Sequence, residues 1–304
     1  MLINKLSIND YQEILDTLHG DPKFAIIYFC LKSELNCWSP TTKVVGWKLF
    51  DDSYIAYGVL NILQSGKPYF HMQSNIFDIE KSEKAAKYLF IEILPFFRDE
   101  EDFCIACPNE FMISFRKLFV QTTPFIHILI DDGGILFYID EKSYEKYIDK
   151  EIIIPEKYII DKLSPEDSEM MVNVYLFKGR GDINRITNRI NEFPNVCIKD
   201  KESNKIVSFI HNDGYGFLAH QYTFPDYRKQ GLGTICEKSL SKFNKKLLNI
   251  IPLKGVSIHR KYVLEYTRKS GYWRRIPSSI QQDTDIYWTV FSKKNLEKVI
   301  AKDN

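Results

Sequence analysis

One stretch of the chain combines residue types that could bind an anion. Residues 223–234 place two adjacent basic residues and two glycines between a strand-like run and a helix-like run. Gly231 and Gly233 lack a Cβ atom, so a bulky anion could approach the backbone there. The first N–H groups of a helix have no internal partner, and the helix dipole favours negative charge. Arg228 and Lys229 would add mobile positive charge. The stretch therefore predicts a phosphate cradle at a helix N-terminus.

The elements around this loop must hold it in place. Residues 215–223 are predicted to form the strand that enters it, and residues 232–249 the helix that leaves it. From residue 158 to 291, hydrophobic periodicity predicts the order strand, helix, helix, three strands, the loop, then helix, strand, helix and strand.

The first half of the chain also alternates strands and helices. Residues 79–97 show apolar side chains at helical spacing. Residues 24–30 are continuously apolar, and we expect a buried strand there. Strands predicted at 125–130 and 135–139 flank two aspartates and two glycines at 131–134, which would form a hairpin turn.

Length and composition indicate a folded protein of about two domains. The chain has 304 residues, and its 44% hydrophobic content argues against disorder. A charged, tyrosine-rich stretch at 141–157 marks the boundary, so we predict domains at 1–150 and 151–304. No apolar run approaches the roughly 20 residues of a membrane helix, and the N-terminus is unlike a signal or transit peptide. We expect a cytoplasmic protein with no membrane partner.

The cysteines do not indicate a metal site. Cys104-Ile-Ala-Cys107 is a single CxxC pair, whereas a zinc site would need a second pair. A redox motif would place the first cysteine at a helix N-terminus, but this pair lies in a strand-like run. We expect buried structural thiols and no metal.

Net charge is unevenly distributed. Residues 222–275 hold 13 Lys or Arg and 3 Asp or Glu, a net charge of +10, and the other residues carry −9. A basic segment centred on the loop suits a polyanionic ligand. Nucleic acid is an alternative ligand, but the segment lacks an aromatic platform or a recognised nucleic-acid motif. We therefore expect a small-molecule partner and no nucleic acid.

The loop resembles a known cofactor signature. Arg228-Lys-Gln-Gly-Leu-Gly233 fits the R/Q-x-x-G-x-G/A pattern of the GNAT superfamily of acyltransferases, and Gly271-Tyr272 falls where that superfamily places a Gly-Phe pair. Residues 162–230 further resemble glycine N-acyltransferase and its relatives. The matching segments are Lys162-Leu-Ser-Pro-Glu-Asp, Asn195-Val-Cys-Ile-Lys-Asp and Tyr222-Thr-Phe-Pro-Asp-Tyr-Arg-Lys-Gln-Gly-Leu.

The resemblance implies a fold and a reaction. The expected fold is α/β, with two tandem GNAT-like halves, each a mixed, mostly antiparallel sheet flanked by helices; the first half would be degenerate. The second half would bind acyl-CoA, without a metal, and transfer an acyl group to the amine of glycine or another small acceptor. Because that family is often mitochondrial, a mitochondrial location is the alternative to the cytoplasm. The expected cofactor-binding residues are Tyr222, Thr223, Phe224, Arg228, Lys229, Gln230, Gly231, Gly233 and Thr234.

The chain departs from the family at the general base. Glycine N-acyltransferases carry a glutamate on the strand before the loop, and the matching position here is Phe217. His220 lies on the same strand and titrates near neutrality when unperturbed, so it is the first candidate base. His211 and His259 are weaker candidates. For the acid that protonates the leaving thiolate, Tyr266 and Tyr262 are the candidates. Backbone N–H groups at 222–224 could polarise the thioester carbonyl.

A non-catalytic alternative follows from the same departure. A protein that kept the cradle and lost the glutamate could bind acyl-CoA without transferring its acyl group. The sequence does not decide between the enzyme and this pseudoenzyme, and it does not give the acyl chain, the acceptor or the oligomeric state.

Overall fold

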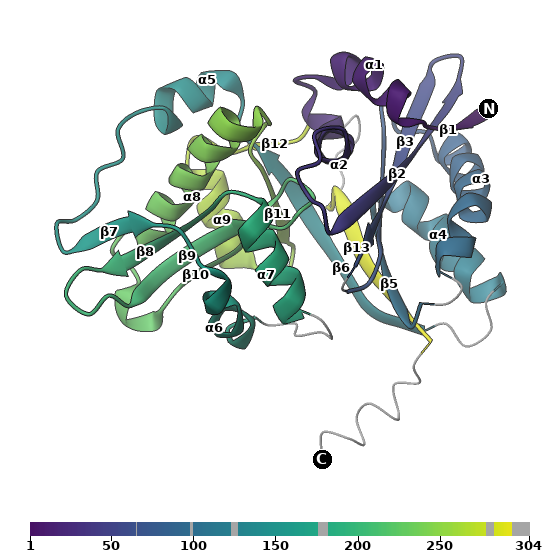
Figure 1. Cartoon of the computed structure of the whole chain (residues 1–304). Coiled ribbons are helices and arrows are strands. Elements are labelled where there is room, and N and C mark those ends of the chain that lie inside the picture. The colour runs from purple at the N-terminus through teal and green to yellow at the C-terminus, as the bar shows by residue number, and fades with distance from the viewer. Residues whose placement is uncertain (65, 98–99, 123–126, 176–181, 278–282, 294–304) are drawn as a thin grey trace.

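The protein has two lobes that lie side by side (Figure 1). The structure is a computed structural model that describes residues 1–64, 66–97, 100–122, 127–175, 182–277 and 283–293. Among the helices in these ranges, none is long and apolar enough to cross a membrane.

The first lobe is built on a large, mainly antiparallel sheet. Its strands are β1 (Leu2–Lys5), β2 (Thr42–Asp51), β3 (Tyr54–Leu63), β4 (Tyr69–Ser74), β5 (Asp102–Cys107), β6 (His127–Tyr138), β11 (Leu253–Ser257), β12 (Arg274–Arg275) and β13 (Ile286–Ser292). The sheet order is β1-β2-β3-β4-β5-β13-β6-β11, with β12 paired to β6, and only the β4–β5 pair is parallel among these described strands.

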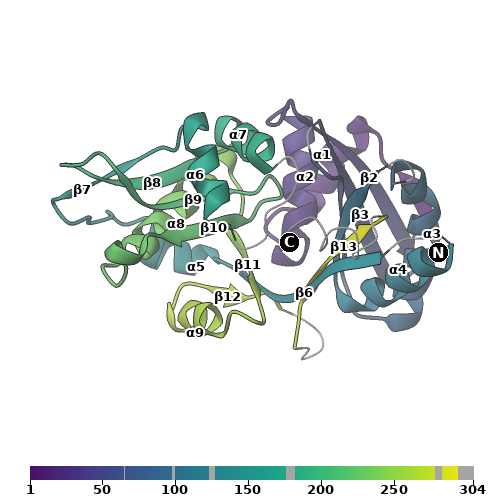
Figure 2. The same ribbon diagram turned by 90° about the horizontal axis from the view of Figure 1, so that it is seen from below.

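Four helices cover the two faces of this sheet (Figures 1 and 2). Helices α1 and α2 pack on one face and α3 and α4 on the other, so each face has its own hydrophobic core. The predicted helix at 79–97 is confirmed, and Cys104 and Cys107 are free, buried thiols in β5. The helices are α1 (Ile8–Leu18), α2 (Ala25–Leu35), α3 (Ile79–Phe97) and α4 (Asn109–Thr122).

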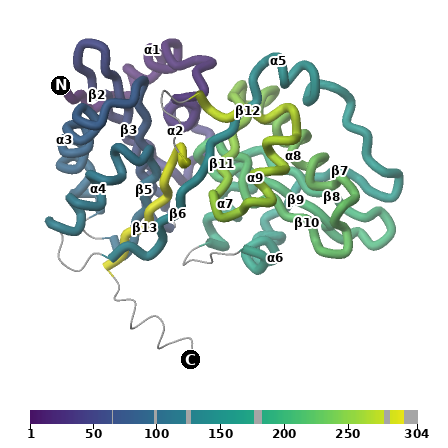
Figure 3. The backbone as a smooth tube through the Cα atoms, turned by 180° about the vertical axis from the view of Figure 1, so that it is seen from behind, coloured from purple at the N-terminus to yellow at the C-terminus, as the bar shows by residue number. Residues whose placement is uncertain are grey.

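The C-terminal strand β13 returns to the first lobe. It lies between β5 and β6, where Tyr287 pairs with Cys107 on one side and Gly133 on the other. Strand β6 continues past β13 and pairs with β11 and β12. Figures 2 and 3 show β6 running from one lobe into the other. The lobes therefore share strands, and the division into domains at residue 150 stays a prediction.

The second lobe carries an antiparallel sheet in the order β10-β9-β8-β7. Helices α6 and α7 pack on one face, and α8 packs on the other. Its elements are α5 (Glu141–Ser143) with a π-helical turn (Tyr144–Ile148), β7 (Tyr158–Asp161), α6 (Ser168–Asn173), α7 (Asp182–Glu192), β8 (Asn195–Asp200), β9 (Ile206–Asn212), β10 (Leu218–Thr223), α8 (Leu232–Phe243) with a π-helical turn (Asn244–Leu248), and α9 (Lys261–Lys269).

The expectation of a buried strand at 24–30 is wrong, because most of this run belongs to helix α2. The helix lies between the lobes, so both sides of it are covered. Ile26 and Ile27 are fully buried, and the ring of Phe29 lies 5.5 Å from that of Phe193 in the second lobe. A helix covered on all sides has no polar stripe, and its apolar run resembles that of a buried strand.

The expected hairpin turn at 131–134 is also wrong, because these residues continue strand β6. Part of the predicted first strand, at 125–126, lies outside the described residues. The glycines make room for a ring of β13: a Cβ on Gly134 would lie 2.2 Å from Trp288 Cζ3. The same ring packs on Gly255 of β11, where a Cβ would lie 2.8 Å from it. Glycine here marks close packing of an aromatic ring, not a turn.

This packing gives a first prediction. Gly134→Ala is expected to destabilise the protein by about 1–3 kcal/mol, because the added methyl group overlaps the indole ring of Trp288. Thermal unfolding followed by circular dichroism measures the change. In a double-mutant cycle, Gly134→Ala should reduce stability less in the Trp288→Leu background than in the wild type, since the smaller leucine side chain relieves the overlap. An alanine variant as stable as the wild type would contradict this packing.

Candidate functional site

The loop after β10 presents free backbone N–H groups at the start of α8. A 3-10 turn (Pro225–Tyr227) follows β10, and Lys229 and Gly231 then adopt left-handed backbone with φ of 62° and 78°. Gly231 caps α8, whose first residue is Leu232. Within the described residues, the N–H groups from Lys229 to Thr234 meet no acceptor. The loop and the helix start thus have the geometry expected of the predicted anion cradle, and anion binding there stays a prediction.

Neighbouring side chains hold this cradle in place. Tyr158 Oη donates to Gln230 Oε1 at 2.7 Å, and Gln221 Nε2 donates to the Gly233 carbonyl oxygen at 2.6 Å. Arg228 Nε donates to the carbonyl oxygen of Thr223 at 3.0 Å. Arg228 is exposed and has no carboxylate partner in the described part of the chain. Its guanidinium is therefore anchored beside the free N–H groups and available to an anion.

A cavity of about 530 Å³ opens between β10 and β11. In the described part of the chain, one isolated parallel bridge joins the two segments, between Phe217 and Leu253. Gln221 lines the cavity and contacts the cradle, so the two features are continuous. Two strands of the first lobe's sheet complete the wall: Asp132 comes from β6 and Trp288 from β13. The cavity wall therefore includes residues from strands of the first lobe's sheet as well as from the second lobe.

His220 lies in the wall of this cavity, at a bulge of β10. The pairing of β10 with β9 shifts register between Ala219 and Tyr222, and His220 has a left-handed φ of 53°. Its ring centroid lies 3.9 Å from that of Tyr175 and 5.2 Å from that of His211. The bulge leaves His220 outside the regular ladder and turns it toward these two rings.

The surroundings of His220 move its pKa away from the value near neutrality of an unperturbed histidine. Part of the side chain has access to solvent, but protein atoms surround it closely, and this enclosure lowers its pKa well below 6.5. Positive charge on Arg185 and Arg189 acts in the same direction. The ring is therefore neutral at pH 7 and is a weaker base than an unperturbed histidine. Its catalytic role stays a prediction.

His211 and Tyr175 form a fixed pair beside His220. The carbonyl oxygen of Asn212 accepts a hydrogen bond from His211 Nδ1 at 2.7 Å, so Nε2 accepts the Tyr175 hydroxyl at 2.9 Å. Burial and, to a smaller extent, the positive charge on Arg189 lower the pKa of His211 to about 3. The pair is thus a neutral imidazole and a phenol. Tyr175 lines the cavity, and His211 is hydrogen-bonded to it. Sequence reasoning missed Tyr175, because no local pattern distinguishes it from the other tyrosines.

Phe217 stands at the position where glycine N-acyltransferases carry a glutamate. Phe217 is buried, lines the cavity and lies edge-on to Trp288, with centroids 6.3 Å apart. No titratable group can act from this side chain. Of the N–H groups expected to polarise a carbonyl, that of Phe224 already donates to Val207 at 3.0 Å.

The candidate acids lie on α9, next to the cradle. The Tyr266 hydroxyl forms a hydrogen bond with Thr234 Oγ1 in the first turn of α8. Tyr262 is largely exposed on the same helix. Neither is among the described residues that line the cavity, whereas Tyr175 is. His259, a weaker base candidate, is exposed, with Nε2 3.9 Å from Asp132 Oδ1. The acid role of Tyr266 stays a prediction.

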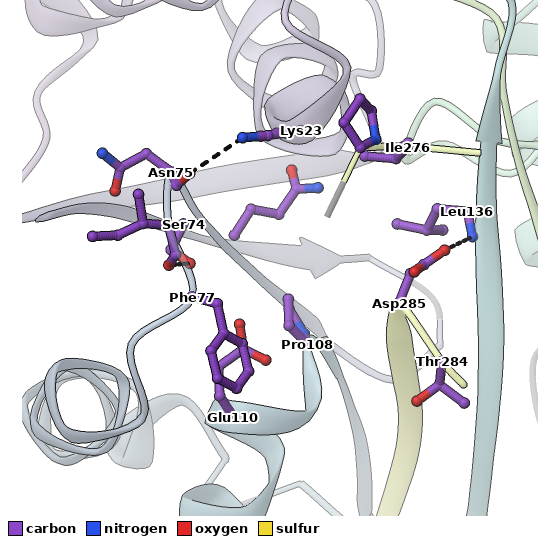
Figure 4. Close-up of a pocket in the computed structure, with 13 residues that line it drawn as sticks. Lys23, Ser74, Asn75, Phe77, Pro108, Glu110, Leu136, Ile276, Thr284 and Asp285 are labelled. Carbon is purple, nitrogen blue, oxygen red and sulfur yellow. Dashed lines mark hydrogen bonds between the residues drawn. The ribbon is translucent and has the colours of Figure 1, made fainter. Parts of the chain in front are cut away.

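The first lobe has a smaller pocket at the equivalent point of its own sheet. Figure 4 shows it beyond the ends of the parallel strands β4 and β5, where Phe77, Pro108 and Glu110 lie close together. Its volume is about 90 Å³. The loop at 75–78 between β4 and α3 holds no glycine and no basic residue, and Lys23 Nζ donates to its Asn75 carbonyl oxygen at 3.4 Å. The 75–78 loop therefore lacks the glycines and basic residues that would make a phosphate cradle.

Solved structures share this fold over nearly the whole chain. A Drosophila melanogaster protein solved by structural genomics matches 95% of the chain and 98% of its own, with a TM-score of 0.71 and 14% identity. A GCN5-related N-acetyltransferase from Sphaerobacter thermophilus matches 97% and 96%, with a TM-score of 0.54 and 10% identity. A tandem GNAT protein from the clavulanic acid biosynthesis pathway matches 97% and 99%, with a TM-score of 0.51 and 11% identity.

No family model and no curated protein sequence matches the chain. Identities of 10–14% show a shared fold alone. The chain is thus an α/β protein with two tandem GNAT-like halves, each a mixed, mainly antiparallel sheet flanked by helices, which confirms the predicted fold class.

Proposed function

We propose that the second lobe binds an acyl-CoA and transfers its acyl group to the amine of a small acceptor. The observation that carries this proposal is the continuity of the cradle with the cavity between β10 and β11. A cradle at a helix N-terminus suits a pyrophosphate, and the cavity between β10 and β11 suits the extended arm that joins it to the thioester. The GNAT-like fold is consistent with this chemistry.

Each expected cofactor residue has a defined place in the proposed complex. The N–H groups of the loop and first helical turn would hold the pyrophosphate, with Arg228 and Lys229 as counter-charges. The end of β10 would line the arm of the cofactor. The first group comprises Lys229, Gln230, Gly231, Gly233 and Thr234, and the second comprises Tyr222, Thr223 and Phe224.

The acceptor is proposed to be glycine or another small amino acid. Support comes from the resemblance of residues 162–230 to glycine N-acyltransferases. The sequence names His220 as the first candidate base and Tyr266 as the candidate acid, and both roles stay predictions. The functional units remain 1–150 and 151–304, with β13 returning to the first sheet.

Phe217 favours a second candidate function, a non-catalytic acyl-CoA-binding protein. Its buried ring occupies the place of the family's base, so binding could persist without chemistry. The two functions differ in one observable. An enzyme releases free CoA thiol only when an acyl-CoA and an amine are both present.

A thiol-release assay separates the two functions. We expect purified protein, mixed with acetyl-CoA and longer acyl-CoAs against a panel of amino acids and polyamines, to release thiol in an amine-dependent manner. Omission of the amine is the matched control for simple thioester hydrolysis. Saturable acyl-CoA binding with no amine-dependent release would exclude the enzyme and leave the binding protein.

A further inference from the structure

The Asp213 carboxylate lies at the backbone of Phe217, the position where glycine N-acyltransferases carry a glutamate. It lies in the turn between β9 and β10 and lines the cavity together with Phe217 and His220. Asp213 Oδ1 accepts the N–H groups of Tyr215 at 2.7 Å and Phe217 at 3.1 Å, and the Asp213 N–H donates to the Phe217 carbonyl oxygen at 3.1 Å. These hydrogen bonds thus hold the Asp213 carboxylate at the backbone of Phe217.

The geometry leaves one carboxylate oxygen for a ligand. Oδ1 takes both backbone N–H groups, whereas Oδ2 has no donor in the described part of the chain. The turn uses left-handed backbone at Gly214 and Gly216, with φ of 85° and 96°. A Cβ on Gly216 would lie 3.0 Å from Phe29 of α2. Helix α2 of the first lobe therefore holds the turn against the cavity.

The charges around Asp213 allow it to exchange a proton near neutrality. Burial raises its pKa to about 6, while the Arg189 guanidinium and the two backbone N–H groups act in the opposite direction. Burial also raises the pKa of Cys30 to about 12, so this thiol stays neutral. The charged and titratable groups around the carboxylate are Arg185 and Arg189 of α7, Cys30 of α2, His211 of β9 and Tyr215 of its own turn.

We propose that Asp213 is the general base of the acyl transfer, in place of the glutamate that position 217 lacks. The inference rests on the proposed function. Asp213 Oδ2 takes one proton from the acceptor ammonium, and the neutral amine attacks the thioester carbonyl carbon. The C–N bond forms and the C–S bond breaks. The nitrogen's second proton goes to the leaving thiolate, giving CoA thiol and an amide, and Asp213 returns its proton to solvent.

A structural role in the turn is the competing explanation, and Asp213→Asn separates the two. Asparagine keeps an oxygen that can accept both backbone N–H groups, but it cannot take a proton. We expect the variant to keep its thermal unfolding midpoint and its affinity for acetyl-CoA, while kcat falls about 100-fold or more. Asp200→Asn is the matched control, because Asp200 also accepts two hydrogen bonds in a turn, both from Ser203, but lies outside the cavity.

The wild-type pH profile tests the proposal even if the asparagine variant fails to fold. The base must be ionised, so kcat/KM should fall as pH drops through about 6. Asp213→Asn with kcat within about threefold of wild type, or a wild-type profile flat across pH 6, would overturn the assignment. Wild-type protein that binds acetyl-CoA but shows no amine-dependent thiol release would also overturn it. Failure to bind acetyl-CoA would instead overturn the proposed function.

Discussion

Arg228→Glu should weaken the binding of acyl-CoA by about 100-fold or more, which corresponds to about 2.7 kcal/mol. A charge-assisted hydrogen bond contributes about 1.5–3 kcal/mol, and a carboxylate beside the phosphates would add repulsion. Arg228 is held at the cradle through its bond to Thr223 and has no carboxylate partner among the described residues, so its guanidinium is free to bind a phosphate. Isothermal titration calorimetry with acetyl-CoA measures the change.

The control for this variant changes net charge by the same amount in the other lobe. Lys84 is exposed on α3, so Lys84→Glu should leave acetyl-CoA affinity within about twofold, since charges beyond a Debye length are largely screened. Equal affinities for Arg228→Glu and wild type would mean that the cradle does not bind the phosphates. Equal losses of acetyl-CoA affinity in both variants would mean that only the overall electrostatic field of the protein affects binding.

Glu237→Ala should destabilise the second lobe by about 3–5 kcal/mol, because it leaves a buried lysine without its partner. Glu237 lies fully buried on α8, where it accepts Lys254 Nζ at 2.5 Å and the Tyr272 hydroxyl at 2.6 Å. Lys254 belongs to β11 and lines the cavity, so this network joins α8 to one wall of the site. Urea unfolding followed by circular dichroism measures the loss.

The pH dependence gives an independent check of this network. Burial, the largest single influence, raises the pKa of Glu237, but the Lys254 charge and the hydrogen bonds from Lys254 and Tyr272 together outweigh it, so the folded-state pKa lies below the ordinary 4.5. The contribution of this carboxylate to stability is therefore fully present above the ordinary pKa of 4.5, and it is lost as pH falls through the folded-state pKa. The double variant Glu237→Leu/Lys254→Met should recover stability, because an apolar pair leaves no buried charge. A double variant no more stable than Glu237→Ala would contradict this account.

Features with local causes could be predicted from the sequence. The cradle depends on glycines, basic residues and a helix start that are adjacent in the chain, and the structure brings them together as expected. The amphipathic helix α3 was likewise predictable, because one face packs on a sheet and the other faces solvent.

Features with distant causes could not be predicted in this way. The glycines of β6 look like a turn until Trp288 of β13 is placed on them. Helix α2 looks like a strand until the second lobe covers its outer side. The same holds at the site: His220 loses its ordinary pKa because rings and guanidinium groups from other elements surround it. Asp213 looks like a turn residue until the cavity is seen beside it.

The most direct test of the central claim is a crystal structure of the protein with an acyl-CoA. We expect the pyrophosphate within hydrogen-bond distance of the N–H groups at 229–234, with Arg228 as its counter-charge. The thioester should lie in the cavity between β10 and β11, beside His220 and Asp213. An acyl-CoA bound elsewhere, or with its pyrophosphate away from this loop, would contradict the account.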